Sequence, residues 1–186
     1  AELLQVKEQL GRQALRDSLR RELFVSELST KAALLISGKG RKQCVTEIRV
    51  AECSARHVAD AVDDLMRNDT TANRHNNLLA CPDHYLLEPR GDILEVIETT
   101  GGSPLAARFF MRFEDESGLV APRGPAYAFQ SAGTARLGDG TVIGGVRHQF
   151  RDEGDDAVAR LIGEFPAATP QRMIREHQWH LACEFS

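Results

Sequence analysis

Residues 127–151 read YAFQSAGTARLGDGTVIGGVRHQFR, and this stretch holds the strongest local signal in the chain. Two runs with strand-like alternation, 127–137 and 141–151, flank an Asp139-Gly140 pair. A tight hairpin turn requires positive φ, and Asp and Gly accept that conformation at the lowest cost. The stretch therefore predicts two antiparallel strands joined by a short turn.

Turn signals continue on both sides of this hairpin. A Pro/Gly-rich loop at 118–125 precedes it, and further Gly and Pro clusters separate short apolar segments. From Asp83 onward we therefore expect six antiparallel strands, followed by an amphipathic helix from about residue 169 to the end. The four strands outside the hairpin are expected at 84–88, 92–99, 105–115 and 157–165.

The part of the chain before Asp83 reads mainly as helix. Leu15, Leu19 and Leu23 recur at four-residue spacing, which is typical of the buried stripe of a helix. A Ser in front of an apolar-periodic run is a favoured helix cap. The expected elements are a helix over 2–36, a strand over 44–52, a helix capped by Ser54, and a second helical piece over 71–80.

Charge divides the chain near Lys42. Residues 1–42 carry a net charge of +4 and the remaining residues −8, within a total of −4. We interpret 1–42 as an N-terminal helical segment whose end, SGKGRK at 37–42, is a solvated basic linker, and 43–186 as the main domain. An acidic main domain argues against a nucleic-acid binder, because phosphate binding needs a clustered basic face.

Composition indicates a globular protein whose core does not need disulfide bonds or a structural metal. Aromatic residues make up only 6% of the chain, and the four cysteines form no CxxC pair. We expect reduced cysteines in a cytoplasmic protein, with Cys44 in the most electropositive surroundings. No stretch approaches the roughly 18 apolar residues of a membrane span, and no signal peptide is visible. Because the chain begins at Ala1, a complete chain and a part of a longer one are both compatible with it.

The order of elements from residue 43 is strand, two short helices, six antiparallel strands and a long C-terminal helix. This order resembles the START-like helix-grip superfamily, which includes pollen allergens, lipid-transfer START domains and polyketide cyclases. The strand CVTEIRV at 44–50, leading into a helix after Ser54, also resembles the opening of those domains. The resemblance implies an α+β fold in which a curved antiparallel sheet wraps around the C-terminal helix and an apolar cavity lies between them. The extra N-terminal helix leaves open a cone-shaped helix-plus-sheet fold of the dehydratase type.

Alternation along the strands assigns candidate ligand-binding residues. One face of each strand is apolar, and that face would line the cavity or fill the core. A methionine beside aromatic rings suits an adaptable pocket wall. The candidates are Phe109, Met111, Phe113, Val146 and Phe150 from the sheet, with Met173 and Leu181 from the C-terminal helix.

Three residues are candidates for catalysis. His148 shares the apolar face of its strand, and His177 lies on the apolar side of the C-terminal helix. Imidazole titrates near neutral pH, so either could act as a general acid or base. Tyr127 could polarise a substrate carbonyl from an adjacent strand.

A metal site is a further alternative. His177, His180 and Glu184 are three and four residues apart, so they lie on one side of the helix, and His148 could be a fourth ligand. Such ligands suit zinc or iron. In the competing interpretation the histidines bond to nearby carbonyls and Glu184 lies in solvent. The zincin pattern is absent from the sequence, so we expect neither a metal nor another cofactor.

Three functions remain open. The first is binding of a small hydrophobic or amphipathic ligand, such as a lipid or a polyketide-like molecule. The second is a cyclase- or dehydratase-type enzyme that uses a cavity histidine. The third is an interaction module, or a homodimer, that pairs through the N-terminal helix. Neither nucleic acid nor a membrane span is expected.

Overall fold

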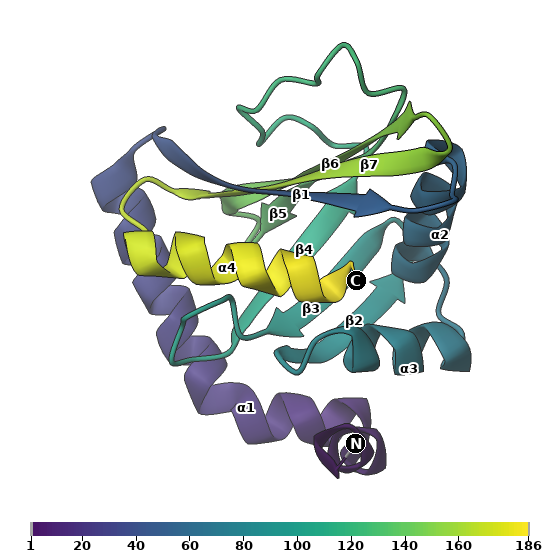
Figure 1. Cartoon of the computed structure of the whole chain (residues 1–186). Helices are drawn as coiled ribbons and strands as arrows, with labels where there is room; N and C mark the ends of the chain where they lie inside the picture. The colour runs from purple at the N-terminus through teal and green to yellow at the C-terminus, as the bar shows by residue number, and fades with distance from the viewer. Residues whose placement is uncertain (1, 186) are drawn as a thin grey trace.

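The computed structural model describes residues 2–185, and within them one seven-stranded antiparallel sheet curves over the C-terminal helix (Figure 1). The strands lie in the order β1-β7-β6-β5-β4-β3-β2. The elements are α1 (Glu2–Ser37), β1 (Arg41–Val50), α2 (Ala55–Arg67), α3 (Thr71–Ala80), β2 (His84–Arg90), β3 (Ile93–Glu98), β4 (Ala107–Phe113), β5 (Phe129–Arg136), β6 (Val142–Glu153), β7 (Asp156–Pro166) and α4 (Gln171–Glu184).

The hairpin between β5 and β6 is confirmed. Gly140 adopts φ +86°, and the Leu137 amide donates to the Thr141 carbonyl at 2.9 Å to close the turn. The Asp139 carboxylate accepts from the Thr141 amide at 3.0 Å and pairs with Lys31 of α1 at 2.8 Å. The same turn therefore aligns two central strands and holds the N-terminal helix.

The prediction of a solvated linker over 37–42 is wrong for its last two residues. β1 begins at Arg41, and Arg41 and Lys42 pair with Pro166 and Phe165 at the end of β7. Lys42 also donates to the Thr169 carbonyl at 2.7 Å. These basic residues belong to the sheet because an edge strand needs only one hydrogen-bonded neighbour, and both side chains are half-buried there.

Helix α1 packs along the sheet instead of projecting from it. It contacts β2, β4 and α3, and Leu15 and Leu23 are buried against this chain's own sheet. Gly11, at φ +71°, marks a kink within it. Arg16 pairs with Glu88 and Glu95 on the sheet. The leucine stripe therefore packs within one molecule, and the homodimer stays a prediction.

Helix α4 lies inside the curve of the sheet (Figure 1). A Cβ atom on Gly101 would overlap the backbone of His177, so only glycine permits this approach of the β3–β4 loop to the helix. A Cβ on Gly163 of β7 would meet the His177 ring at 3.5 Å. The two glycines thus hold His177 tightly between a loop and a strand.

The loop between β4 and β5 carries its own polar network. Arg147 of β6 is 4% exposed, lies 2.6 Å from the Glu116 carboxylate and donates to the Ala121 carbonyl at 2.9 Å. Glu164 of β7 accepts hydrogen bonds from the amides of Val120 and Ala121. Buried charge is satisfied in this way, and the loop is tied to two strands. No helix within residues 2–185 is long and apolar enough to cross a membrane.

Candidate functional site

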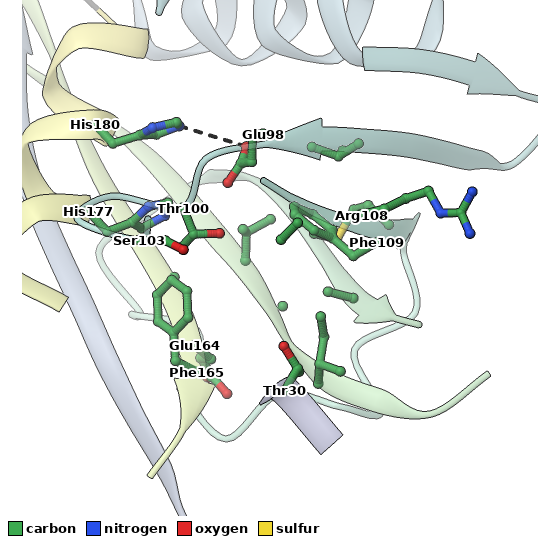
Figure 2. Close-up of a pocket in the computed structure, with 18 of the residues that line it drawn as sticks. Thr30, Glu98, Thr100, Ser103, Arg108, Phe109, Glu164, Phe165, His177 and His180 are labelled. Carbon is green, nitrogen blue, oxygen red and sulfur yellow. Dashed lines mark ion pairs between the residues drawn. The ribbon is translucent and has the colours of Figure 1, made fainter. Parts of the chain in front are cut away.

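A pocket of about 400 Å³ lies between the sheet and α4 (Figure 2). Thr30 and Ala33 of α1 also line it, so the N-terminal helix contributes to the site. Its wall is mainly apolar. Six of the candidate ligand-binding residues line it: Phe109, Met111, Phe113, Val146, Met173 and Leu181.

Val146 lies between two glycines in the strand registers, Gly133 on β5 and Gly163 on β7. A Cβ on Gly133 would overlap the Arg112 carbonyl at 2.6 Å, and a Cβ on Gly163 would meet the Phe165 ring at 3.3 Å, so these glycines permit close packing beside Val146. Alternation places Phe109, Met111 and Phe113 on the same face of β4.

Two candidates lie elsewhere, which corrects the prediction. Phe150 shares a strand face with Val146 but is 0% exposed in the core cluster that includes Ala55 and Met66 of α2. Tyr127 precedes β5, and its hydroxyl lies 3.5 Å from the Glu47 carboxylate. Phe150 therefore fills the core beneath α2. Tyr127 packs beside Arg151, outside the pocket.

His148 and His177 both line the pocket, and burial alters both imidazoles. Desolvation lowers the pKa of His148 to about 4 and, with nearby histidines, that of His177 to about 3. Both rings are therefore neutral at pH 7. The Nδ1 atoms of the two rings, like Oγ of Ser131, have no hydrogen-bond partner in the part of the chain that the structure describes. Ser131 is the cross-strand neighbour of His148.

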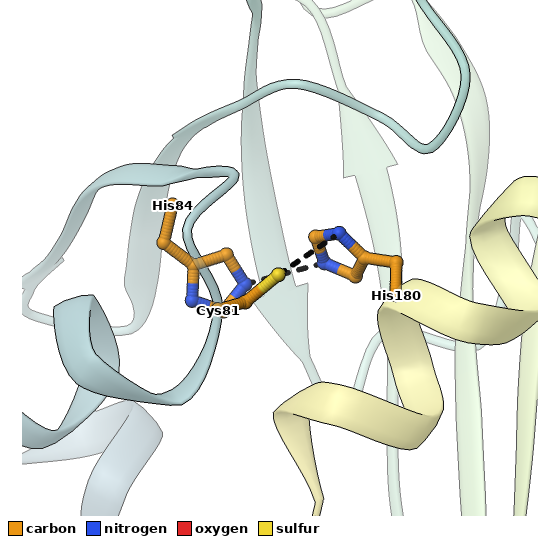
Figure 3. Close-up of side chains that lie close together, drawn as sticks. All are labelled: Cys81, His84 and His180. Carbon is orange, nitrogen blue, oxygen red and sulfur yellow. Dashed lines mark hydrogen bonds between the residues drawn. The ribbon is translucent and has the colours of Figure 1, made fainter.

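A second cluster adjoins this end of the pocket. His180 lies beside His84, and Figure 3 shows Cys81 next to them. Glu98 approaches His180 from β3, as Figure 2 shows, and Glu184 comes from the end of α4. Burial raises the pKa of Glu98 to about 8, with a further contribution from Glu184. Burial also raises the pKa of Glu184, whose side chain is 13% exposed instead of lying in solvent.

Sequence reasoning missed His84 and Glu98. Glu98 ends the strand segment ILEVIE, and a carboxylate in such an apolar segment is a signal for a buried polar site. His84 carries no comparable signal, because its partner is 96 residues away in sequence. The electropositive surroundings expected for Cys44 do not lower its thiol pKa, because the side chain is buried and burial raises that pKa to about 12.

The low pKa of His148 predicts an acid-sensitive fold. The folded-state value of about 4 lies below the ordinary 6.5, so the unfolded chain binds the extra proton between these two pH values. Stability from neutral His148 is complete above pH 6.5 and is lost as the pH falls to 4, by about 3 kcal/mol in all. Urea unfolding at pH 7 and pH 4 should therefore show a smaller loss in His148→Leu than in the wild type. The control is His57→Leu, at an exposed histidine, which should lose as much unfolding free energy as the wild type. An equal loss in the wild type and His148→Leu, or an equally reduced loss in His57→Leu, would contradict the role of His148.

The element order, the curved antiparallel sheet and the long C-terminal helix inside it define a START-like helix-grip fold. No protein-family model matches the chain, and no curated protein matches it.

Among solved structures, Ara h 8.0201 is 10% identical with a TM-score of 0.48, and the match covers 78% of this chain and 93% of that one. A START superfamily protein from Mycobacterium smegmatis is 15% identical with a TM-score of 0.47, covering 75% and 91%. CalU16 from Micromonospora echinospora is 15% identical with a TM-score of 0.44, covering 80% and 76%. Likeness of this degree does not identify a ligand or a reaction.

Proposed function

We propose that the protein binds one small amphipathic molecule in the pocket between the sheet and α4. The observation that carries the proposal is the pocket itself, about 400 Å³ with an apolar wall and a polar end. Ligand sites are typically concave and apolar, with a few polar groups that orient the ligand. The apolar part of the ligand would lie along Phe109, Met111 and Val146, and its polar group would face His148 and His177.

The polar end favours an uncharged head group. His148 and His177 are neutral at pH 7, and the raised pKa of Glu98 keeps that carboxyl largely protonated. In the metal-free protein an anionic head group at this end would lose its hydration beside neutral groups, which is costly in a buried site, because the pocket's Arg108 is exposed on β4. A hydroxyl or carbonyl can instead exchange hydrogen bonds with neutral donors and acceptors. Alcohols, sterols and polyketide-like ketones are therefore the favoured class.

The test begins with Nile red, a neutral dye that fluoresces in apolar surroundings. We expect saturable binding at one dye per chain. In Val146→Trp an indole would fill part of the pocket that Val146 lines, and the dye affinity should fall about tenfold or more. The matched control is Val120→Trp in the β4–β5 loop, where Val120 is 57% exposed and should tolerate the change.

Displacement of the dye then reports on the head group. Dodecanol should displace Nile red at a lower concentration than dodecanoate, which has the same chain length but a charge. Dye binding that survives unchanged in Val146→Trp would contradict the pocket as the site. Dodecanoate as the better competitor would contradict the uncharged head group.

An enzyme of the cyclase or dehydratase type is the second candidate. The observation that favours it is His148, a neutral imidazole on the pocket wall with Ser131 as its cross-strand neighbour. Such a group can accept a proton from a bound substrate. His148→Gln should then abolish turnover of a cyclising polyketide while the dye still binds. Unchanged turnover in that variant would exclude His148 as the base.

A further inference from the structure

Two buried imidazoles point the same nitrogen toward each other. Nε2 of His84 on β2 lies 3.2 Å from Nε2 of His180 on α4. Each side chain is only 1% exposed. The ring centroids are 5.0 Å apart in an edge arrangement. The two buried rings therefore lie side by side, with His180 also lining the pocket.

The outer nitrogens of these rings are already engaged. Nδ1 of His84 lies 2.7 Å from the Asn77 carbonyl, which can only accept, so His84 carries its proton on Nδ1. Nδ1 of His180 lies 3.6 Å from Sγ of Cys81 and 3.6 Å from the Asp83 carboxylate. The carbonyl contact fixes the tautomer of His84 and leaves its Nε2 as an acceptor, as outer contacts do for metal-binding histidines. The longer contacts of His180 fit either tautomer, so its Nε2 either donates to Nε2 of His84 or, when Nδ1 carries the proton, shares a cation with it.

Two carboxylates complete the cluster. Oε2 of Glu98 lies 3.8 Å from Nε2 of His180 and 4.0 Å from Nε2 of His84. Glu184 lies 3.9 Å from Nε2 of His84 and 4.0 Å from Nε2 of His180. Two imidazoles and two carboxylates thus converge from β2, β3 and α4.

We propose that His84, His180, Glu98 and Glu184 bind one divalent transition-metal ion, with Zn²⁺ as the best match. Ligands at tetrahedral zinc with bonds of about 2.0–2.2 Å lie about 3.3–3.5 Å from one another. The five separations that join an imidazole to its neighbours are 3.2–4.0 Å and need a contraction of up to about 0.7 Å. Three of these residues, Glu98, His180 and Glu184, also line the polar end of the pocket. The inference does not rest on the ligand-binding proposal, because Zn²⁺ binding to the ligand-free protein is measured with a different probe.

Charge supports a cation at this point. Zn²⁺ would neutralise two carboxylates that have no Lys or Arg partner among the ion pairs of residues 2–185. Buried carboxylates without a counter-charge are costly to ionise, and coordination to a cation removes that cost. Two imidazole nitrogens favour zinc over magnesium or calcium, which prefer oxygen ligands.

A rival donor set shares part of the site. Ligand atoms of Glu98, His177 and His180 also lie within 4.8 Å of one another, as do those of Cys81, His84 and His180. The rings of His177 and His180 are stacked at 4.8 Å, so His177 approaches the cluster from one side. Variants of His84 and His177 separate the proposed set from the set with His177, and Glu98→Gln separates it from the set with Cys81, which lacks Glu98.

The experiment is calorimetric titration of Zn²⁺ into the full chain after dialysis against a chelator. We expect one high-affinity site per chain. Affinity should fall about 100-fold or more in His84→Gln and in Glu98→Gln, since each removes a ligand. The control is the double variant His57→Gln and His75→Gln, which removes two exposed histidines and should leave the site unchanged. Circular dichroism of each metal-free variant checks that the fold is retained.

Three outcomes would overturn the proposal. The first is the absence of a high-affinity site in the wild type, and the second is a site that the control variant removes. The third is loss of binding in His177→Gln with full affinity in His84→Gln, which would assign the rival set. Co²⁺ gives an independent readout in the wild type, where four N/O ligands predict the intense visible bands of tetrahedral cobalt. Weak octahedral bands would also contradict the assigned geometry.

Discussion

Truncation of Phe150 to alanine is expected to lower the free energy of unfolding by about 3–5 kcal/mol, the range for buried Phe→Ala changes. Phe150 is 0% exposed and belongs to the core cluster that includes Ala55, Val62 and Met66 of α2. Removal of its ring would leave a cavity beneath α2 that the surrounding strands cannot collapse to fill. Urea unfolding monitored by circular dichroism measures the change.

The matched control for this truncation is Phe24→Ala. Phe24 lies on α1 and is 63% exposed, so the same change there should stay within about 0.5 kcal/mol. The folded fraction of Phe150→Ala should still bind Nile red, because Phe150 does not line the pocket. A cost as small as that of the control would show that Phe150 is not the core residue we infer.

Replacement of Arg16 by methionine is expected to cost about 2 kcal/mol, below the range for a buried charge that loses its last partner. Arg16 lies on α1 and pairs with Glu88 and with Glu95, whose side chain is 3% exposed. Without the guanidinium, Glu95 keeps Arg90 at 3.0 Å, and Glu88 keeps Arg12 at 2.7 Å and Arg90 at 2.6 Å. These remaining arginines moderate the cost.

The same experiment tests whether residues 1–42 unfold separately from 43–186. Because α1 packs on the sheet and lines the pocket, we expect a single unfolding transition. Its urea midpoint should move to a lower concentration in Arg16→Met. Arg20→Met, one helical turn later on an exposed position, should have almost no effect. A second transition, or an Arg16→Met protein as stable as Arg20→Met, would indicate an N-terminal segment that does not stabilise the rest.

Local sequence signals were sufficient for most of the fold. The α3 helix spans 71–80 as expected, Ser54 accepts from the His57 amide as the cap of α2, and Gly140 makes the hairpin turn. These features depend on a few neighbouring residues, so propensity and turn chemistry suffice to predict them. The faces of β4 and β6 were also predictable, because side chains alternate along any strand.

The position of the site along those faces was not predictable in the same way. Val146 and Phe150 share a face of β6, yet the first lines the pocket and the second packs beneath α2. Alternation assigns a face, but the placement of helices over that face decides which residues meet a cavity. Likewise the spacing on α4 identified His177, His180 and Glu184, while His84 and Glu98 joined them only through the tertiary fold.

The central claim is that the space between the sheet and α4 is a binding site. A crystal structure of the full chain with dodecanol tests this most directly. We predict electron density for the chain beside Phe109, Met111 and Val146, with the hydroxyl at the His148 and His177 end. Dodecanol bound at another surface, or a pocket closed by collapsed side chains under saturating dodecanol, would contradict the account.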